Sequence, residues 1–138
     1  MKTIFITGGT GYIGRRLIRR LVARGHRVIA LARKGSELKV PDGAIVITGN
    51  PFDAGSFQDR VPKDSIWVQL LGVAHPSPSK AQQFRDIDLR SVKAAADAAA
   101  HAKAAHFIYV SVAMTPSKLM QAYQEVRQEG ENYCLDKK

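Results

Sequence analysis

Five short apolar runs recur along the chain, separated by polar stretches. They cover residues 3–6, 26–32, 44–48, 65–71 and 106–112. Within them Val, Ile, Leu and aromatic side chains follow one another with few interruptions, as in strands that are buried on both faces of a parallel sheet. We therefore predict five strands at these positions.

The stretch between the first two runs has the period of an amphipathic helix. Ile13, Leu17 and Leu21 fall on one side of residues 13–24, and arginines fall on the other. Gly25 follows as a C-terminal stop. Because a strand, a short helix and a second strand follow in sequence, we expect a right-handed parallel crossover.

The remaining intervals complete an alternation of strands and helices. Further helices are predicted at residues 53–57 (capped by Asp53), 80–103 and 117–133, and a proline-containing loop is predicted at 72–79. The alternation predicts an α/β fold: one Rossmann-like domain over residues 1–138, with helices on both faces of a doubly wound parallel sheet of strand order 3-2-1-4-5. Its ligand crevice is expected at the carboxyl ends of strands one and four.

The segment between the first strand and the first helix carries glycines at the spacing of a phosphate-binding loop. Gly8 tolerates backbone angles that a Cβ forbids, Gly11 lets the main chain approach a ligand, and Gly14 lets the helix pack tightly. The free N–H groups of the first helical turn and the helix dipole favour an anion such as a pyrophosphate. A tight turn without a ligand also selects glycine. The candidate ligands of the pyrophosphate are Gly8, Thr10, Gly11, Tyr12, Ile13 and Gly14.

The end of the second strand carries two cations. NAD-selective folds place an acid at this point to hold the ribose hydroxyls, whereas an Arg accommodates a 2′-phosphate. Here Arg33 and Lys34 stand without an acid beside them, so NADP(H) is favoured over NAD(H). The alternative is a solvated basic turn before Gly35.

The net charge of +9 also raises the question of nucleic-acid binding. The densest basic cluster includes Arg16, Arg20 and Arg24, which share one helix face and suit a solvated surface. No aromatic residues are interleaved with them for base stacking, so nucleic acid is an unlikely partner.

Composition bounds the remaining classes. No apolar run approaches the ~20 residues of a bilayer span, so no membrane partner is expected. The first strand starts at once, and we expect no signal peptide. A single cysteine, Cys134, cannot form an internal disulfide, which favours the cytoplasm. No metal site is expected.

With these residues placed, the chain resembles the short-chain dehydrogenase/reductase superfamily, in its extended and atypical branches (epimerase/dehydratase-like and NmrA-like proteins). The residues that carry the resemblance are the loop at 7–14, Gly49-Asn50-Pro51, Leu70-Leu71-Gly72-Val73 and the strand that ends in Ser111. The resemblance implies adenine contacts from Asn50 and Pro51. It also implies ribose contacts from Leu70, Leu71, Gly72 and Val73.

The superfamily's chemistry uses a serine, a tyrosine and a lysine four residues after the tyrosine. A cation is needed because a phenol of pKa near 10 is a poor base at neutral pH. The resemblance assigns Ser111 and Tyr123 to these roles, with Arg127 in place of the lysine. A permanently charged fork is no simple substitute for an ammonium. Alternatively Tyr123 packs as core with Leu119, Met120 and Val126. Asp88 is a second departure, because extended members usually carry Asn there.

Relatives continue beyond the equivalent of residue 138. We therefore expect a chain truncated at its C-terminal end, lacking the substrate-binding region, with the edge of strand five open to a second copy in a homodimer. Three functions compete. The first is an NADP(H)-dependent oxidoreductase domain that moves a hydride to or from a small carbonyl or alcohol. The second is a non-catalytic NADP(H)-binding redox sensor or structural protein, and the third is a basic nucleic-acid scaffold.

Overall fold

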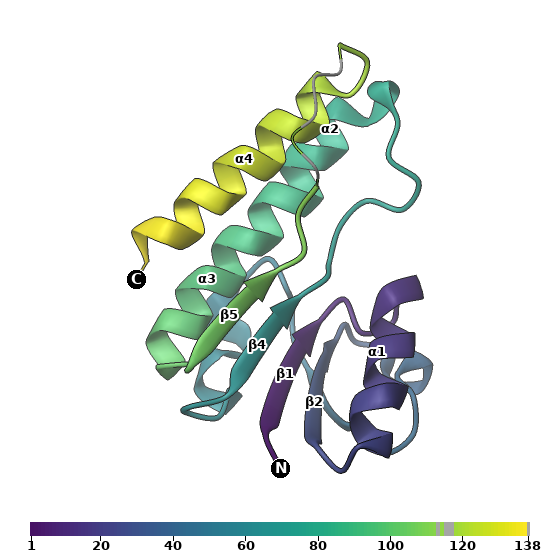
Figure 1. Cartoon of the computed structure of the whole chain (residues 1–138), viewed down its shortest axis with the longest axis vertical. Coiled ribbons are helices and arrows are strands. Elements are labelled where there is room, and N and C mark those ends of the chain that lie inside the picture. The colour runs from purple at the N-terminus through teal and green to yellow at the C-terminus, as the bar shows by residue number, and fades with distance from the viewer. Residues whose placement is uncertain (113, 115–117, 138) are drawn as a thin grey trace.

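Five parallel strands form one sheet in the order β3-β2-β1-β4-β5, which confirms the predicted order. Figure 1 shows β2, β1, β4 and β5 side by side. The structure is a computed structural model that describes residues 1–112, 114 and 118–137. The strands are β1 (Thr3–Thr7), β2 (Arg27–Ala32), β3 (Ile45–Thr48), β4 (Ile66–Gln69) and β5 (His106–Tyr109).

Strands β4 and β5 are shorter than predicted. The fourth apolar run continues to Leu71 and the fifth to Val112, but the ladder between them ends at Gln69 and Tyr109. One more hydrogen bond follows, from Val110 N to Gln69 O at 3.2 Å. Beyond it β4 has already given way to the loop at 70–73, so the end of β5 has no adjacent strand with which to pair.

The register aligns side chains of the three central strands in rows across the sheet. Phe5, Trp67 and Phe107 form one row. The ring centroids are 4.5 Å apart for Phe5 and Trp67, and 5.9 Å apart for Trp67 and Phe107. Two residues farther along each strand, and therefore on the same face, the next row consists of Thr7, Gln69 and Tyr109. The aromatic row lies in the core, and the polar row lies at the carboxyl ends of the strands.

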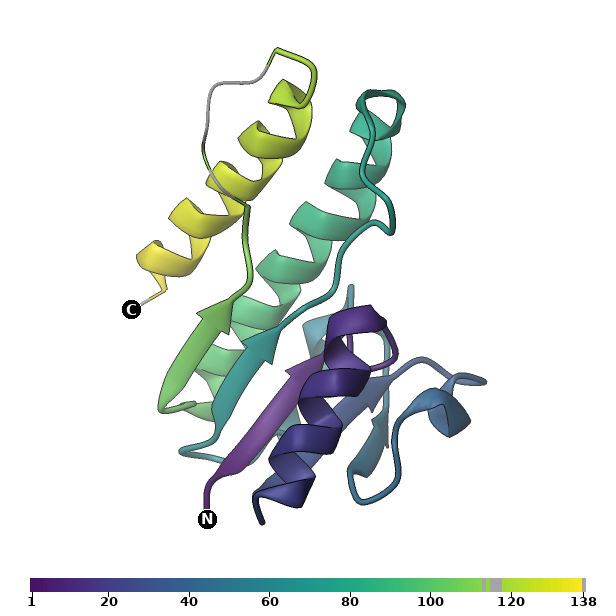
Figure 2. The ribbon, with the colours of Figure 1, turned by 45° about the vertical axis from the view of Figure 1, so that its right-hand side comes forward.

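Helix α1 (Tyr12–Ala23) covers the opposite face of β1 and β2, in front of the sheet in Figure 2. Its Ile18 is fully buried, and Leu17 and Leu21 pack around it. Ile13 differs from the predicted stripe, because its side chain is 55% exposed. It belongs to the first turn of the helix, next to the glycine loop at the strand ends, where the sheet no longer covers it.

The other face carries the long helical stretch of the chain. One 3-10 turn, η4 (Pro78–Lys80), leads into α2 (Ala81–Gln83), the π-helical turn η5 (Phe84–Leu89) and α3 (Arg90–Ala102). The prediction of a helix at 80–103 is thereby confirmed, with one added feature, the π turn. Smaller 3-10 turns are η1 (Glu37–Lys39), η2 (Ala54–Ser56) and η3 (Gln58–Arg60).

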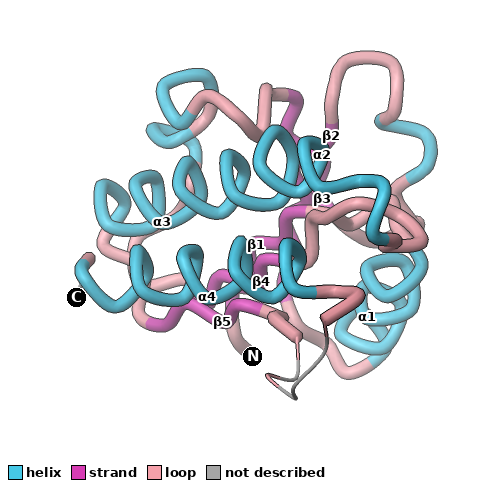
Figure 3. The backbone as a smooth tube through the Cα atoms, turned by 90° about the horizontal axis from the view of Figure 1, so that it is seen from above, coloured by secondary structure: helices cyan, strands magenta, loops and turns pink. Residues whose placement is uncertain are grey.

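The last helix, α4 (Gln121–Asp136), lies beside α3 on the same face of the sheet (Figure 3). It begins and ends later than the predicted 117–133: residues 118–120 form a turn, and Ser117 lies outside the described residues. Helices therefore cover both faces, but unevenly. On the α1 side of β5, Ile108 and Val110 are 48% and 41% exposed. No helix in the described part of the chain is long and apolar enough to cross a bilayer.

Candidate cofactor-binding cleft

The glycine loop after β1 leaves no room for side chains at two of its positions. Gly8 has φ +77°, and a Cβ on it would lie 2.6 Å from Leu71 N. A Cβ on Gly14 would collide with the carbonyl oxygen of Gly8 and lie 2.7 Å from Gly9 Cα. The loop therefore brings β1, the end of β4 and the start of α1 into direct backbone contact, as the spacing of the glycines predicts.

The N-terminus of α1 is left without compensating charge. Gly11 is its N-cap and contributes no side-chain hydrogen bond, and the first turn contains no acidic residue. The nearby arginines turn back along the helix: Arg16 Nη1 donates to Tyr12 O at 3.1 Å, and its guanidinium lies 3.7 Å above the Tyr12 ring. The partial positive charge of the helix end is therefore available to an anion.

A cleft of about 280 Å³ opens beside this loop. It runs along the carboxyl ends of β2, β1 and β4. It is lined by Thr7, Gly8, Thr10, Gly11, Leu31, Ala32, Arg33, Ser36, Pro51, Phe52, Leu70, Leu71, Gly72 and Ile87. Of the residues predicted to contact a cofactor, Gly8, Thr10, Gly11, Arg33, Pro51, Leu70, Leu71 and Gly72 line the cleft, whereas Tyr12, Ile13, Gly14, Lys34, Asn50 and Val73 do not.

The β2 end of the cleft presents a cation and a hydroxyl. Arg33 and Ser36 both line it. The nearest acid in sequence, Glu37, does not line it, because its carboxylate accepts from Gly35 N at 2.8 Å and from Thr48 Oγ1 at 3.3 Å. Hydrogen bonding from its own backbone amide, and then from Gly35, holds the pKa of Glu37 below its usual value. Ser36 was missed from sequence, although its place just after Gly35 in the same turn is a usable signal.

The side of the cleft that is expected to hold the adenine differs from the predicted arrangement. The amide oxygen of Asn50 accepts from Phe52 N at 3.0 Å, so this acceptor is used in its own turn. Pro51 and Phe52 line the cleft instead. Phe52 offers a flat apolar surface, with the Arg90 guanidinium 5.3 Å from its ring centroid. It is a second cleft-lining residue, after Ser36, that the sequence did not predict.

The glycine loop, the uncompensated helix end and a cleft free of acidic side chains fit an elongated phosphorylated ligand. A sequence profile described as NAD(P)H-binding matches residues 8–138. The chain belongs to the NAD(P)H-binding family. The expected relationship to epimerase/dehydratase-like short-chain dehydrogenases/reductases is thereby confirmed, and the cofactor class is a nicotinamide dinucleotide.

A curated relative supports this membership, and solved structures share the fold. Rice (Oryza sativa subsp. indica) divinyl chlorophyllide a 8-vinyl-reductase, a chloroplastic protein, is 32% identical over 94% of this chain and 35% of its own length. A UDP-galactose 4-epimerase structure shares the fold with a TM-score of 0.82 at 17% identity, over 97% of this chain and 50% of that chain. The Bordetella bronchiseptica enzyme WbmH in complex with NAD+ shares it with a TM-score of 0.79 at 17% identity, over 99% and 52%. The chain therefore spans about a third of the curated reductase and about half of the epimerase structures.

The three predicted reactive residues of this NAD(P)H-binding chain do not line the cleft. Ser111 Oγ is buried without a hydrogen-bond partner among the described residues. The Tyr123 ring lies 4.8 Å from the ring of Phe84 and packs, with Met120, against the buried Val126. This matches the core alternative except for Leu119, which is 76% exposed.

Arg127 is buried and has several partners besides Tyr123. Its Nη2 donates to Asp88 Oδ1 at 2.5 Å, and its Nη1 donates to Tyr109 OH at 3.2 Å and to Val110 O at 3.0 Å. Its guanidinium carbon is also 5.2 Å from the Tyr123 ring centroid. Burial alone would lower the pKa of Arg127, but Tyr109, Asp88 and Tyr123 outweigh it and the pKa is raised. Its charge is thus shared among several partners.

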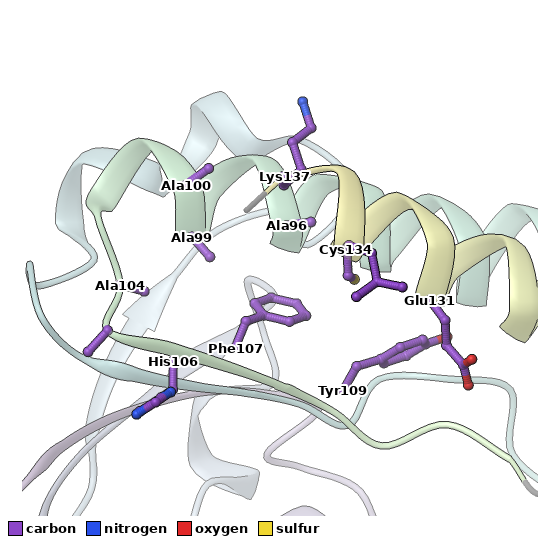
Figure 4. A pocket seen from close by; sticks show the side chains of 12 residues that line it. Ala96, Ala99, Ala100, Ala104, His106, Phe107, Tyr109, Glu131, Cys134 and Lys137 are labelled. Carbon is purple, nitrogen blue, oxygen red and sulfur yellow. The ribbon is translucent and has the colours of Figure 1, made fainter.

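A second depression lies far from the glycine loop. We call it the alanine hollow: about 610 Å³ between the last turns of α3, β5 and the C-terminal turns of α4. Figure 4 shows Phe107 and Tyr109 projecting into it from β5, opposite small side chains of α3 and Cys134 of α4. The described residues contain no group of three or more His, Cys, Asp or Glu side chains that could hold a metal ion.

Proposed function

We propose that this chain binds NADP(H) in the cleft and forms the cofactor-binding part of an oxidoreductase. The pyrophosphate lies at the N-terminus of α1, the adenosine 2′-phosphate lies at Arg33 and Ser36, and the nicotinamide half passes over Leu70–Gly72. The observation that carries this proposal is that a cation and a hydroxyl, without any acidic side chain, line the cleft where the second strand ends.

Charge decides between the two dinucleotides. A carboxylate at this position would accept hydrogen bonds from the 2′- and 3′-hydroxyls of NAD(H) and repel a 2′-phosphate. Arg33 favours the phosphate, because a guanidinium forms strong, directional hydrogen bonds with phosphate oxygens. Glu37 is tied to Gly35 and Thr48 and does not offset this charge within the cleft.

Replacing the cation tests the assignment. Arg33→Ala is expected to weaken NADPH by about 30-fold, corresponding to loss of about 2 kcal/mol from charge-assisted hydrogen bonds, and to leave NADH within about twofold. The measurement is enhancement of nicotinamide fluorescence on titration with protein. Arg24→Ala, which removes an exposed arginine at the other end of α1, is the matched control for net charge. Equal losses for NADPH and NADH would refute the 2′-phosphate contact.

The chemistry follows from the cofactor class and from the reductase relative. A bound nicotinamide supplies or accepts a hydride, and the protein positions and polarises the substrate. The substrate is a small carbonyl or alcohol. Tyr123 is the group proposed to exchange a proton with it, and Ser111 is the group proposed to orient it. We expect carbonyl-dependent NADPH oxidation by the wild type and its loss in Tyr123→Phe, with unchanged NADPH affinity as the control.

The second candidate is a non-catalytic NADP(H) binder. It is favoured by the commitment of Arg127 to Asp88, which offsets the charge that a Tyr123 phenolate would require. NADPH binding by a wild type that oxidises no NADPH with any of a panel of aldehydes, ketones and enones would favour this candidate. Binding of neither dinucleotide at millimolar protein would discard both.

Two further statements complete the proposal. The β5 edge and the exposed Ile108 and Val110 suit a second copy of the chain, and sedimentation at micromolar concentration tests this. A mass equal to one chain would count against a dimer. Nucleic acid is not a proposed partner, and the cytoplasm is the proposed location, although the name of the rice relative places that protein in the chloroplast.

A further inference from the structure

A layer of polar side chains lies in the protein beneath the cleft, where an apolar core is the norm. We define the polar layer as Thr7, Gln69 and Tyr109 of the sheet, Asp88 and Ser91 of the η5–α3 segment, and Arg127 of α4. All except the half-buried Tyr109 are at most 6% exposed. The layer joins the strand that precedes the glycine loop to the last helix.

Hydrogen bonds connect its members from one side to the other. Thr7 Oγ1 donates to Gln69 Oε1 in a short contact. Gln69 Nε2 donates to Ser91 Oγ at 3.3 Å, and Ser91 Oγ donates to Asp88 O at 3.1 Å. The π turn η5 carries Asp88 on its buried side, together with Phe84 and Leu89. From there the Asp88 carboxylate reaches Arg127.

The ion pair of this layer touches the wall of the cleft. Asp88 Oδ2 accepts from Val73 N at 3.2 Å. A Cβ on Gly72, which lines the cleft, would lie 2.5 Å from Arg127 Nη2 and 2.6 Å from Asp88 Oδ1. The backbone of residues 72–73 therefore rests directly on the two charged groups, and glycine is required for that approach.

The buried Asp88–Arg127 ion pair contributes little to the free energy of unfolding, because removing its two charges from water opposes folding. Removing two charges from water costs several kcal/mol per ion in real proteins, and an apolar pair of similar volume often serves at least as well. What the pair provides is a fixed geometry: the planar Arg127 fork holds Asp88, Tyr109 and Val110 O together, and Asp88 holds Val73. Fixed geometry matters most beside a ligand.

We propose that Asp88 and Arg127 are positioning residues that hold the Gly72–Val73 wall in place for the nicotinamide half of the cofactor. The inference rests on the proposed NADP(H) binding. Because β2 and β4 lie on opposite sides of β1, a dinucleotide with its 2′-phosphate at Arg33 and its pyrophosphate at α1 extends its other half over β4. Adenosine 2′,5′-bisphosphate occupies only the first part of that path.

The test compares two ligands in the same variants. Arg127→Met is expected to weaken NADPH by about 20-fold and adenosine 2′,5′-bisphosphate by no more than about twofold. Arg127→Lys keeps the charge but not the fork, so we expect it to restore less than half of the lost NADPH affinity on a logarithmic scale. Calorimetry measures both ligands on the folded full chain, with urea unfolding of every variant in parallel.

Two control variants separate positioning from stability. Val61→Ala removes a buried methyl pair from the core cluster around Phe5 and Trp67, which does not include residues 72–73. Glu129→Gln removes the exposed carboxylate of α4 that lies 3.5 Å from Arg85 and 3.6 Å from Lys93. Both are expected to leave the ratio of the two affinities unchanged, whatever stability they lose.

A second variant covers the case in which Arg127→Met does not fold. Gly72→Ala directs a methyl group at the ion pair and is expected to weaken NADPH selectively while leaving adenosine 2′,5′-bisphosphate within about twofold. Equal weakening of both ligands in Arg127→Met or Gly72→Ala, or no weakening in either, overturns the inference alone. A wild type that binds adenosine 2′,5′-bisphosphate and NADPH equally tightly also overturns it. A wild type that binds neither overturns the proposed function together with the inference.

Discussion

The cleft and the alanine hollow are both open depressions, and the hollow has more than twice the volume of the cleft, about 610 against 280 Å³. The cleft is bounded by the glycine loop before α1, the carboxyl ends of three strands and the side chains that follow them, such as Arg33 and Phe52. The hollow is bounded by small side chains of α3, two aromatic rings of β5 and the end of α4, with Lys137 and Glu131 among its lining residues (Figure 4).

The difference shows that volume does not identify a site. The hollow is bordered by the short side chains of Ala96, Ala99 and Ala104, and its described lining residues include no glycine and no N-terminal turn of a helix. The smaller cleft lies beside a helix N-terminus without an acidic residue in its first turn. It also contains Arg33 and adjoins glycines at which a Cβ would collide with neighbouring backbone. Backbone that cannot tolerate a side chain, next to uncompensated positive charge, is the more specific sign of phosphate binding.

The largest effect is expected at the helix start. In Gly14→Ala the new methyl meets Gly8 O and Gly9 Cα, so the loop must move and the N–H groups of α1 leave their place. We expect NADPH to bind at least about 100-fold more weakly and the free energy of unfolding to fall by about 2 kcal/mol. Fluorescence titration and urea unfolding measure the two quantities.

Two other glycines serve as controls for this variant. Gly11→Ala meets only Gly8 O, at 3.4 Å, so it should keep its stability and still lose about 10-fold in affinity, because its methyl lies where the main chain approaches the pyrophosphate. Gly55 lies in η2, and a Cβ on it would be 3.3 Å from Asp53 Oδ1. Gly55→Ala should change neither the affinity nor the stability. If Gly14→Ala bound NADPH with wild-type affinity, the assignment of the pyrophosphate to this loop would be wrong.

Features that depend on residues close together in sequence could be predicted, whereas features that depend on distant residues could not. Strand positions, strand order and the glycine loop are set by local patterns and by short, handed connections, and the structure matches them. Arg33 was located in the same way, because it follows a strand directly. The ends of β4 and β5 were less predictable, because each depends on where its neighbour stops.

The candidate catalytic residues show the limit of prediction from sequence. The spacing of Tyr123 and Arg127 correctly implies a shared helix face, since the guanidinium lies 5.2 Å from the ring centroid. This spacing contains no information on Asp88, which is 39 residues away in sequence and forms an ion pair with Arg127. A usable signal exists in hindsight: β1, β4 and β5 each end in aromatic, aliphatic, polar order, as in Phe5-Ile6-Thr7, which marks the polar row in register.

A second prediction sharpens the comparison from the side of the hollow. Burial raises the pKa of the Cys134 thiol to about 11, and the Glu131 charge adds to the effect. With about 100-fold less thiolate than an unperturbed cysteine, the thiol should react with an aromatic disulfide reagent about 100-fold more slowly at pH 8. The urea-unfolded chain, which has the same single cysteine, is the control.

The sign of the linked pH effect is fixed by the same shift. A thiol whose pKa is higher in the folded state stabilises the fold below its unfolded pKa, and this contribution is lost as the pH rises through about 11. Equal reaction rates in the folded and unfolded chain would mean that the hollow is open to the reagent and hydrated, which would make it a stronger candidate for a ligand site.

The smallest effect separates two buried alanines of one helix, of which only Ala96 borders a cavity. Ala95 and Ala96 are neighbours on α3, but Ala95 lies in the core with Phe5 and Trp67, whereas Ala96 lines the hollow. Ala95→Leu should lower the free energy of unfolding by about 2 kcal/mol through overpacking, whereas Ala96→Leu, which extends into free space, should change it by less than about 0.5 kcal/mol.

Both leucine variants should bind NADPH within about twofold of the wild type, because neither position reaches the cleft. Urea unfolding and fluorescence titration check the pair side by side. Similar losses of stability would mean that α4 closes over the hollow in solution, so that no free volume exists there. Loss of NADPH affinity in Ala96→Leu alone would connect the hollow to the cleft, and Tyr109, which lines the hollow and contacts Arg127, is the residue through which that connection would run.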